Sequence, residues 1–312
     1  MIINEYHEPV LLQEVLSYLD LKQGDTVFDG TLGGAGHTIA IIKEIAPTGK
    51  VIGVDLSSQA ISTATRKLER FKDKVILVND NFANIKSILE ELGFITVDKI
   101  LLDLGLSSYQ IEKSGKGFSY IRDEKLDMRF GSRGLSAYEV VNHYREEDLK
   151  KIFYQYGEEK WAKMIAANIV SKREKEEIRT TGRLAEIVAE SIPRSRKPRK
   201  GHPAKRVFQA IRIEVNEELK NLSTAIDDGF EVLSEGGRMA IISYHSLEDR
   251  IVKNKFLDFK GKCTCPPDFP VCRCGAVKKA NLLTKKAVKA TLQEVEKNPR
   301  ASSAKLRVIE KI

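Results

Sequence analysis

Four short apolar runs that alternate with helical patterns constrain the fold more than any other feature of the chain. These runs are rich in Val, Ile and Leu, and they cover residues 26–30, 50–57, 74–80 and 98–105. Short β-branched runs spaced by helices are typical of βαβ units and a parallel sheet. We therefore predict an α/β fold with a mostly parallel sheet.

The strand pattern stops after residue 107 and returns only near the end of the chain. Residues 108–210 show helical patterns such as "SAYEVVNHY" and "WAKMIAANIVSKREK", and a longer helical pattern follows at 214–233. Strand signals return at 236–246 and 304–312. We predict one α/β domain, formed by residues 1–107 and 211–312, with an inserted helical domain over residues 108–210.

The segment "FDGTLGGAGHT", residues 28–38, follows the first apolar run and holds four glycines within seven residues. Three interpretations are open: a turn without a ligand, a dinucleotide site, or a site for S-adenosylmethionine (SAM). A P-loop is excluded because no Gly-Lys-Ser/Thr follows. The dinucleotide pattern fits poorly, because its third glycine would fall at Ile39.

Acidic and aromatic residues fall at the ends of the predicted strands. Asp29, Asp55 and Asp103 each end a run, and Phe82 follows the third. Ligands of open α/β sheets bind beyond these strand ends, where Asp55 suits the ribose hydroxyls of a nucleoside and Phe82 an adenine ring. Several carboxylates favour a cation such as the sulfonium of SAM. Individually, Asp55 could instead cap a helix, Phe82 could be core and Asp103 a turn residue.

The net charge of +8 and the pI of about 9.1 arise largely from one segment, residues 193–206. A basic run of this kind is either a solvated loop or a surface that contacts phosphates. The candidate RNA-binding residues are Arg194, Arg196, Lys197, Arg199, Lys200, Lys205 and Arg206.

Blocks of sequence along nearly the whole chain carry a resemblance to a known family. They include "HEPVLLQE", "DGTLGGAGHT", "LLDLGLSS", "LDMR", "HPAKRVFQAIRIEVNEEL", "SYHSLEDRIVK" and "NPRASSAKLRV". The chain resembles the bacterial 16S ribosomal RNA cytosine-N4 methyltransferases of the MraW type. The resemblance implies a Rossmann-like SAM-dependent methyltransferase fold whose inserted helical domain recognises the substrate. It also implies a target, the exocyclic N4 of a cytosine in the decoding centre of 16S rRNA, within the small ribosomal subunit or its precursor.

The resemblance also implies a set of SAM contacts, carried over by position. These are Gly33, Gly34, Ala35, Gly36, His37, Asp55, Phe82, Asp103 and Gln110. Many family members have Gly where this chain has Ala35. The backbone N–H of His37, at the start of a helix, would face an anion such as the methionine carboxylate.

Asp103 is also the candidate catalytic residue. Unrelated amino-methyltransferases carry an Asp/Asn/Ser-Pro-Pro-aromatic motif after the fourth strand, and Asp103 occupies that position, although Leu104 and Gly105 follow it here. Near the fifth strand, His245 and Ser246 either line the same site or begin a helix with Ser246 as its N-cap.

All four cysteines lie in "CTCPPDFPVCRC", at Cys263, Cys265, Cys272 and Cys274. Their C-x-C-x6-C-x-C spacing differs from the usual C-x2-C knuckle. A structural zinc site, free thiols and redox bridging all remain open, and we assign no metal.

The remaining features bear on location and on competing functions. No apolar run reaches the roughly 18–20 residues of a membrane span, and the N-terminus lacks a signal pattern, so we expect a cytoplasmic protein. The oligomeric state stays open. Two other functions compete with the methyltransferase: a non-catalytic RNA-binding or ribosome-assembly factor on the same fold, and a nicotinamide oxidoreductase, which Ile39 disfavours.

Overall fold

The computed structural model of this chain describes all residues outside five segments. Those segments are residues 1–8, 107–110, 112–113, 194–201 and 262–276. Within the part of the chain that is described, no helix is long and apolar enough to cross a membrane.

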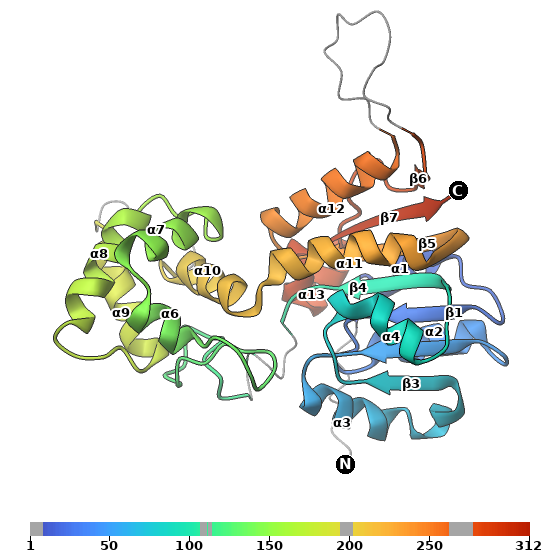
Figure 1. The fold of residues 1–312 in the computed structure, drawn as a ribbon, viewed down its shortest axis with the longest axis horizontal. Helices are drawn as coiled ribbons and strands as arrows, with labels where there is room; N and C mark the ends of the chain where they lie inside the picture. The colour runs from blue at the N-terminus through green and yellow to red at the C-terminus, as the bar shows by residue number, and fades with distance from the viewer. Residues whose placement is uncertain (1–8, 107–110, 112–113, 194–201, 262–276) are drawn as a thin grey trace, which may run out of the picture. The chain divides into compact units, whose positions relative to one another are not determined.

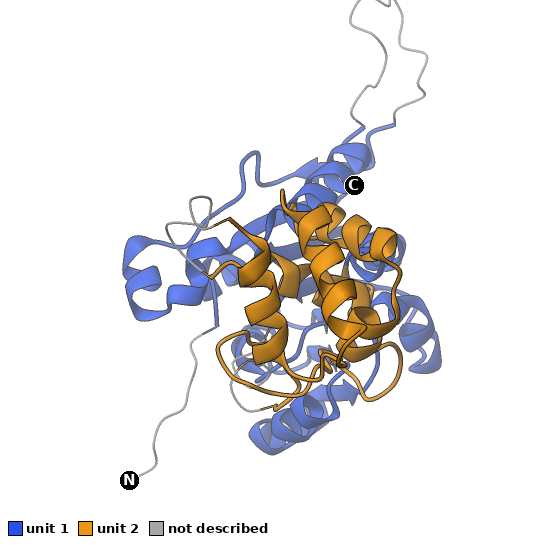
Figure 2. Cartoon of the chain, turned by 90° about the vertical axis from the view of Figure 1, so that its left-hand side faces the viewer, with its two compact units in different colours: residues 1–105, 219–312 blue, residues 106–218 orange. Residues whose placement is uncertain are grey.

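The chain divides into two compact units, coloured separately in Figure 2. One consists of residues 1–105 and 219–312, and the other of residues 106–218. The boundaries predicted from the sequence lie after residues 107 and 210. In the structure the second boundary lies eight residues later, after residue 218. It differs because the helix that begins at Lys205 continues to Asn216.

The first unit is built on a seven-stranded sheet with the order β3-β2-β1-β4-β5-β7-β6 (Figure 1). The strands are β1 (Thr26–Asp29), β2 (Lys50–Val54), β3 (Val75–Val78), β4 (Val97–Asp103), β5 (Leu233–Ser243), β6 (Ala280–Leu282) and β7 (Lys305–Lys311). Strands β1 to β5 pair in parallel, whereas β7 is antiparallel to both β5 and β6. The prediction of a mostly parallel α/β sheet is confirmed, and β6 is an addition to it.

Both faces of the sheet are buried, which explains why the central strands are apolar along their length rather than alternating. In β1, Val27 and Phe28 are both fully buried but belong to different hydrophobic clusters, because successive side chains point to opposite faces. Ile100 and Leu101 of β4 divide in the same way.

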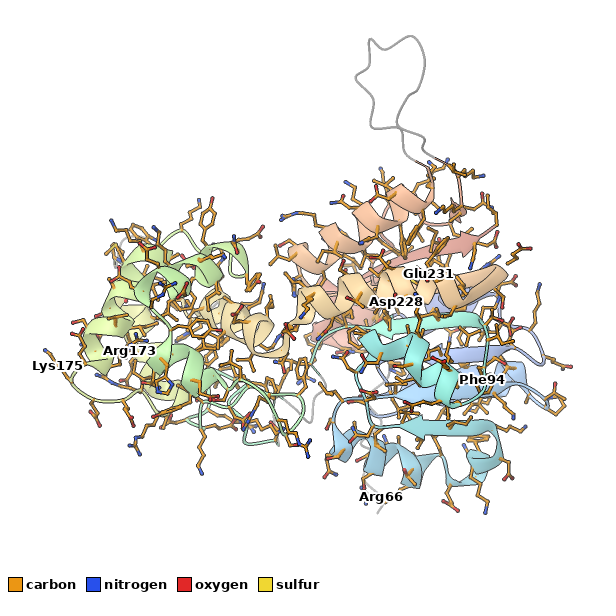
Figure 3. All side chains as sticks on the ribbon, in the orientation of Figure 1. Arg66, Phe94, Arg173, Lys175, Asp228 and Glu231 are labelled. Atoms are coloured by element: carbon orange, nitrogen blue, oxygen red, sulfur yellow. The ribbon has the colours of Figure 1, made fainter. Side chains whose placement is uncertain are left out.

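Helices α2, α3 and α4 confirm the helical patterns between the four apolar runs. The α-helices around the sheet are α1 (Leu12–Leu19), α2 (Gly36–Ile45), α3 (Ser58–Lys67), α4 (Ile85–Glu91), α11 (Glu218–Val232), α12 (Ser246–Phe259) and α13 (Leu292–Lys297), with short 3₁₀ turns at η1 (Glu69–Lys74), η2 (Phe82–Asn84) and η4 (Pro299–Ser303). Helix α1 is not predicted from the sequence, because its N-cap is Leu11 in a left-handed conformation rather than a residue with a capping side chain. Lys86 of α4 forms ion pairs with Asp228 and Glu231 of α11, both labelled in Figure 3.

The second unit is helical, as predicted. Its helices are α6 (Ala137–His143), α7 (Glu146–Gln155), α8 (Ala162–Arg173), α9 (Thr181–Ser191) and α10 (Lys205–Asn216). Arg173, labelled in Figure 3, donates to the carbonyls of Val141 and Tyr144 and so ties α8 to the end of α6. The helix predicted over 214–233 is confirmed as α11 except at its start, because the left-handed backbone of Glu217 (φ 49°) ends α10 and α11 begins at Glu218.

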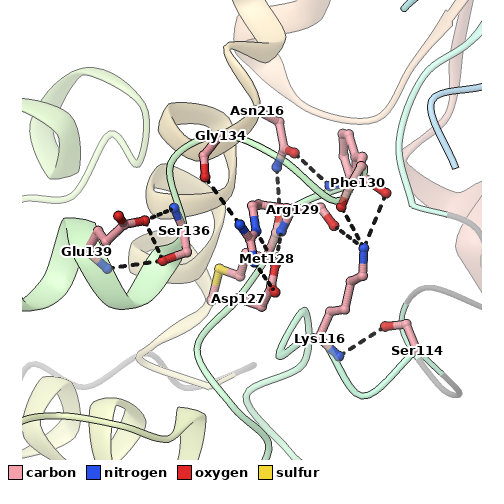
Figure 4. Close-up of polar contacts among 11 residues, drawn as sticks. Ser114, Lys116, Asp127, Met128, Arg129, Phe130, Gly134, Ser136, Glu139 and Asn216 are labelled. Carbon is pink, nitrogen blue, oxygen red and sulfur yellow. Dashed lines mark hydrogen bonds and ion pairs between the residues drawn. The ribbon is translucent and has the colours of Figure 1, made fainter. Parts of the chain in front are cut away.

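A polar network orders the loop that precedes α6 (Figure 4). The ammonium of Lys116 donates to the carbonyls of Arg129 and Gly131 at 3.0 and 2.7 Å, and Arg129 pairs with Asp127 through two nitrogens. Asn216 of α10 donates to Met128 and accepts from the N–H of Phe130. The "LDMR" block is therefore a rigid part of this unit.

Candidate active site

The sheet brings the sequence-predicted acids to one edge. Strands β2, β1 and β4 are neighbours, and they end at Val54, Asp29 and Asp103 respectively. Because these strands are parallel, their carboxyl ends lie along the same edge, and Asp55 follows β2 directly.

The glycine-rich loop between β1 and α2 is shaped by backbone conformations that favour glycine. Gly33 has a φ of 48° and Ala35, the N-cap of α2, has a φ of 62°. A side chain at Gly36 would place its Cβ 2.5 Å from the ring of Pro9, so the chain before α1 closes against the loop. Ala35 is fully buried, and it occupies a left-handed conformation that glycine would adopt without strain.

Asp29 holds this loop together rather than facing a ligand. Its Oδ2 accepts from the Thr38 hydroxyl at 2.5 Å and its Oδ1 accepts from the Thr31 N–H at 3.2 Å. The side chain is almost fully buried, and burial raises the pKa of the carboxyl despite these hydrogen bonds. Asp29 thus joins β1 to the first turn of α2.

Asp55 connects two turns that lie beside each other. Its Oδ2 accepts from the N–H of Gly33 and its Oδ1 from the N–H of Ser57, both at 2.8 Å. The N-cap of α3 is Ser57, whose hydroxyl accepts from Ala60, so Asp55 is not itself the cap. Burial raises the pKa of Asp55, and the two hydrogen bonds oppose that effect.

Phe82 and Gly34 lie near the same turn. Phe82 begins η2 and is half-buried, and a Cβ built on Gly30 would lie 2.9 Å from the Phe82 Cβ. The ammonium of Lys67 in α3 donates to the carbonyl of exposed Gly34 at 3.0 Å. Phe82 packs against the hydrophobic core with part of its side chain, as the core interpretation expects. The rest of the ring is exposed.

His37 lies in the first turn of α2 with its ring buried. Its Nε2 is 3.0 Å from the carbonyl of Val10, which can only accept, so Nε2 carries a proton and donates. Burial lowers the pKa of the imidazole, which is therefore neutral and has a lone pair on Nδ1. That nitrogen lies 3.7 Å from Oδ2 of Asp103.

Asp103 is held from both its backbone and its side chain. Its N–H donates to the Thr31 hydroxyl at 2.6 Å, and the hydroxyl of Tyr244 donates to its Oδ1 at 2.7 Å. Burial raises the pKa of the carboxyl to about 7, the Tyr244 bond opposes the rise, and the charge of Glu248 adds to it. The side chain keeps 23% exposure, so a group that titrates near neutrality remains accessible.

The residues after β5 begin α12 in a different way from the prediction. The N-cap is His245, whose Nδ1 accepts from the N–H of Glu248, and Ser246 is the first helical residue. Glu248 completes the capping box by accepting from the N–H groups of Tyr244 and His245. The alternative of Ser246 as N-cap is therefore wrong, and the His245 ring serves the helix start.

Several predicted site residues fall outside the described residues. Gln110, the four cysteines and Arg194, Arg196, Lys197, Arg199 and Lys200 belong to this group. Lys205 and Arg206 are described: both are exposed in the first turn of α10, and Arg206 donates to the carbonyl of Glu158 at 3.1 Å. These two side chains leave positive charge on the surface of the helical unit.

The sequence does not predict a role for two residues of this site. Thr31 and Tyr244 both lie just beyond strand ends, and each hydrogen-bonds to Asp103. Both lie in blocks that carry the family resemblance, but their pairing with Asp103 depends on β1 and β5 flanking β4.

The chain is similar to curated methyltransferases along almost its whole length. A "Ribosomal RNA small subunit methyltransferase H" from Clostridium botulinum is 50% identical over 307 residues, covering 98% of this chain and 99% of the relative. One of the same name from Ruminiclostridium cellulolyticum is 48% identical over 309 residues, with the same coverage. A solved rRNA methylase from Streptococcus thermophilus has a TM-score of 0.43 at 12% identity, covering 100% of this chain and 99% of that one.

The family comparison spans almost the entire sequence. The model of the MraW methylase family matches residues 4–312, which include both the sheet and the helical unit. The chain therefore belongs to the MraW methylase family.

Proposed function

We propose that this chain transfers the methyl group of SAM to the exocyclic N4 of a cytosine in the decoding centre of 16S rRNA, within the small ribosomal subunit or its precursor. The observation that carries the proposal is Asp103. It is a partly exposed carboxyl with a pKa of about 7 at the carboxyl edge of the sheet, in a chain whose close relatives are named for the small-subunit RNA.

The residues at the sheet edge fit a nucleoside that carries a cation. Asp55 still has acceptor capacity on both oxygens after its two backbone bonds, which suits a vicinal diol. The loop through Gly33, Ala35 and Gly36 presents backbone close to the edge, and the Phe82 ring is partly exposed for stacking. SAM supplies an electrophilic methyl group when it is bound.

The chemical step needs a group that accepts a proton. The N4 lone pair forms the new N–CH₃ bond while the electrons of the broken C–S bond leave with sulfur, and one N4 proton must then depart. Asp103 accepts that proton at Oδ2, since Oδ1 already takes the Tyr244 hydroxyl. Placing the amine in line with the methyl group is the larger contribution, worth up to about 7–11 kcal/mol.

The helical unit and the basic run supply the RNA contacts in this proposal. Lys205 and Arg206 are the last two basic residues of the run and begin α10, and their exposed charges suit phosphates. The target base must leave its stack to reach the sheet edge, which requires contacts that hold the flanking backbone. A cytoplasmic location fits this substrate.

Radiolabel transfer tests the proposal. The purified protein is incubated with methyl-tritiated SAM and either small subunits or free 16S rRNA that lack the modification, and the RNA nucleosides are identified by mass spectrometry. We expect label in N4-methylcytidine. Label in another nucleoside, or binding to RNA without transfer, would replace this function with another methylation or with an assembly role.

A further inference from the structure

Tyr244 lies next to the candidate catalytic residue because of the sheet register. Asp103 pairs with Ile242 across β4 and β5, and Tyr244 is the first residue after β5. From there its hydroxyl reaches Oδ1 of Asp103 at 2.7 Å. The two side chains therefore come from adjacent parallel strands at the same edge.

Gly105 makes room for the Tyr244 ring. A Cβ at Gly105 would lie 2.9 Å from Cδ2 of Tyr244, and the Gly105 backbone has a φ of 113°. Any other residue would collide with the ring and would also strain the backbone. The Leu104-Gly105 pair that follows Asp103 thus has a structural reason: it lets an aromatic ring pack directly beside the carboxyl.

The backbone of Tyr244 is fixed as well. Its N–H donates to Oε2 of buried Glu248 at 2.8 Å, and the same oxygen accepts from the next residue, His245. A phenol that is anchored at its backbone and packed at its ring can direct its single proton at only a narrow region. That proton is directed at one oxygen of Asp103.

The two oxygens of Asp103 therefore differ. Oδ1 receives the phenol proton, whereas Oδ2 faces Nδ1 of His37, which carries a lone pair and cannot donate. Oδ2 is thus the oxygen with capacity for a proton from a substrate.

We propose that Tyr244 is a positioning residue for methyl transfer, whose hydroxyl fixes the rotamer of Asp103 so that Oδ2 is presented to the target amine. This inference rests on the proposed function. It assigns to Tyr244 a role that neither the glycine loop nor the acids at the strand ends reveal.

The hydroxyl also affects the acidity of Asp103. A donor to the ionised carboxylate favours that form, so loss of the hydroxyl raises the pKa of Asp103 further. The other titratable groups around this pair are His37 on α2, Glu248 on α12, Glu294 on α13 and Asp29 at the end of β1. A variant that changes only the phenol leaves these groups in place.

The test is Tyr244→Phe in the full-length protein, which keeps the ring against Gly105. We expect kcat to fall about 10- to 100-fold, as for misplacement of a reacting group. At a pH well above the pKa of Asp103, the SAM Kd should change less than about threefold. We also expect the acidic limb of the kcat–pH profile to move to higher pH. Unchanged kcat with an unchanged acidic limb would overturn the proposal.

Tyr144→Phe is the matched control. Its hydroxyl donates to Oε1 of Glu214 at 2.8 Å, a tyrosine–carboxylate bond of similar length within the helical unit. We expect this variant to lose stability without moving the pH profile. An equal fall in kcat and an equal pH shift in both variants would reduce Tyr244 to a general structural role.

A second measurement keeps the inference separate from the proposed function. In protein labelled with ¹³C-aspartate, NMR can follow the carboxyl resonance of Asp103 as the pH changes, without RNA present. The resonance is assigned by its loss in Asp103→Asn. We expect a higher pKa in Tyr244→Phe than in the parent protein. If the parent methylates no rRNA but the pKa of Asp103 shifts in Tyr244→Phe, the proposed function is wrong and the Tyr244–Asp103 coupling is supported. If the pKa does not shift, the coupling is wrong.

Discussion

Asp103 and Asp127 are two partly buried carboxylates whose surroundings have opposite effects. Asp127 lies in the loop before α6. Burial alone would raise the pKa of its carboxyl, but the hydrogen bonds from Arg129 outweigh that effect and lower the pKa. Asp103 has a neutral phenol and a neutral imidazole as neighbours, and burial raises its pKa to about 7. The guanidinium partner stabilises the ionised form of Asp127, whereas Asp103 has no such partner and can exchange a proton near neutral pH.

The sharpest test of this comparison is Asp103→Asn. We expect methyl transfer to fall by about 10²- to 10⁴-fold, because the amide cannot accept the amine proton. Circular dichroism should be unchanged, since the amide oxygen can still accept from Tyr244. Activity close to that of the parent protein would remove Asp103 from the chemistry.

The same variant carries a stability prediction with a defined sign. The folded-state pKa of Asp103 lies above its ordinary value of 3.8, so the folded protein binds a proton more readily between about pH 4 and 7. The parent therefore loses stability as the pH rises through that window. We expect Asp103→Asn to unfold at a higher temperature than the parent at pH 8, with the difference shrinking at pH 5. A variant less stable than the parent at pH 8 would contradict this.

SAM binding should depend on pH through the same carboxyl. The ionised form of Asp103 attracts the sulfonium, so the affinity for SAM should rise as the pH increases through about 7. Below that pH, the rise should be at most about tenfold per pH unit. S-adenosylhomocysteine, with a neutral sulfur, should show a weaker dependence. Calorimetry from pH 5.5 to 8.5 checks this, and Asp103→Asn should flatten the SAM curve. Equal pH dependence for both ligands would place the titrating group away from the sulfur.

Asp127→Ala tests the structural side of the comparison. It leaves the Arg129 guanidinium without its carboxylate, at a cost of about 1–3 kcal/mol in the free energy of unfolding. Asp148→Ala is the matched control, because its partner Arg145 is 83% exposed; we expect a change within about 1 kcal/mol. Urea unfolding of both variants gives the comparison. Equal effects would mean that the Asp127 pair contributes no more than a surface ion pair.

Ala35→Gly should have the smallest effect. Glycine relieves about 1 kcal/mol of left-handed strain at φ 62° but loses a buried methyl group worth about 0.8 kcal/mol. The two nearly cancel, so urea unfolding should change little, whereas Ala35→Val should destabilise clearly. A glycine variant as damaging as the valine one would show that packing, rather than backbone strain, dominates this loop.

The sequence predicts the parallel part of the sheet because its strands are buried on both faces and appear as continuous apolar runs. It does not predict α1, which lacks a capping side chain, or β6, which has three residues. The positions of Asp55 and Asp103 follow from strand order. The Tyr244–Asp103 bond could not be predicted, because it depends on the register of β4 against β5 and on the space beside Gly105.

The double hydrogen bond of Asp55 limits how this protein can vary in length. One short side chain spans from Gly33 to Ser57, so an insertion in either turn would pull one N–H out of its reach. Surface loops usually accept additional residues at little cost, but these two turns can lengthen only by giving up a contact. Natural insertions and engineered tags alike should therefore be tolerated elsewhere in the chain before they are tolerated at this edge.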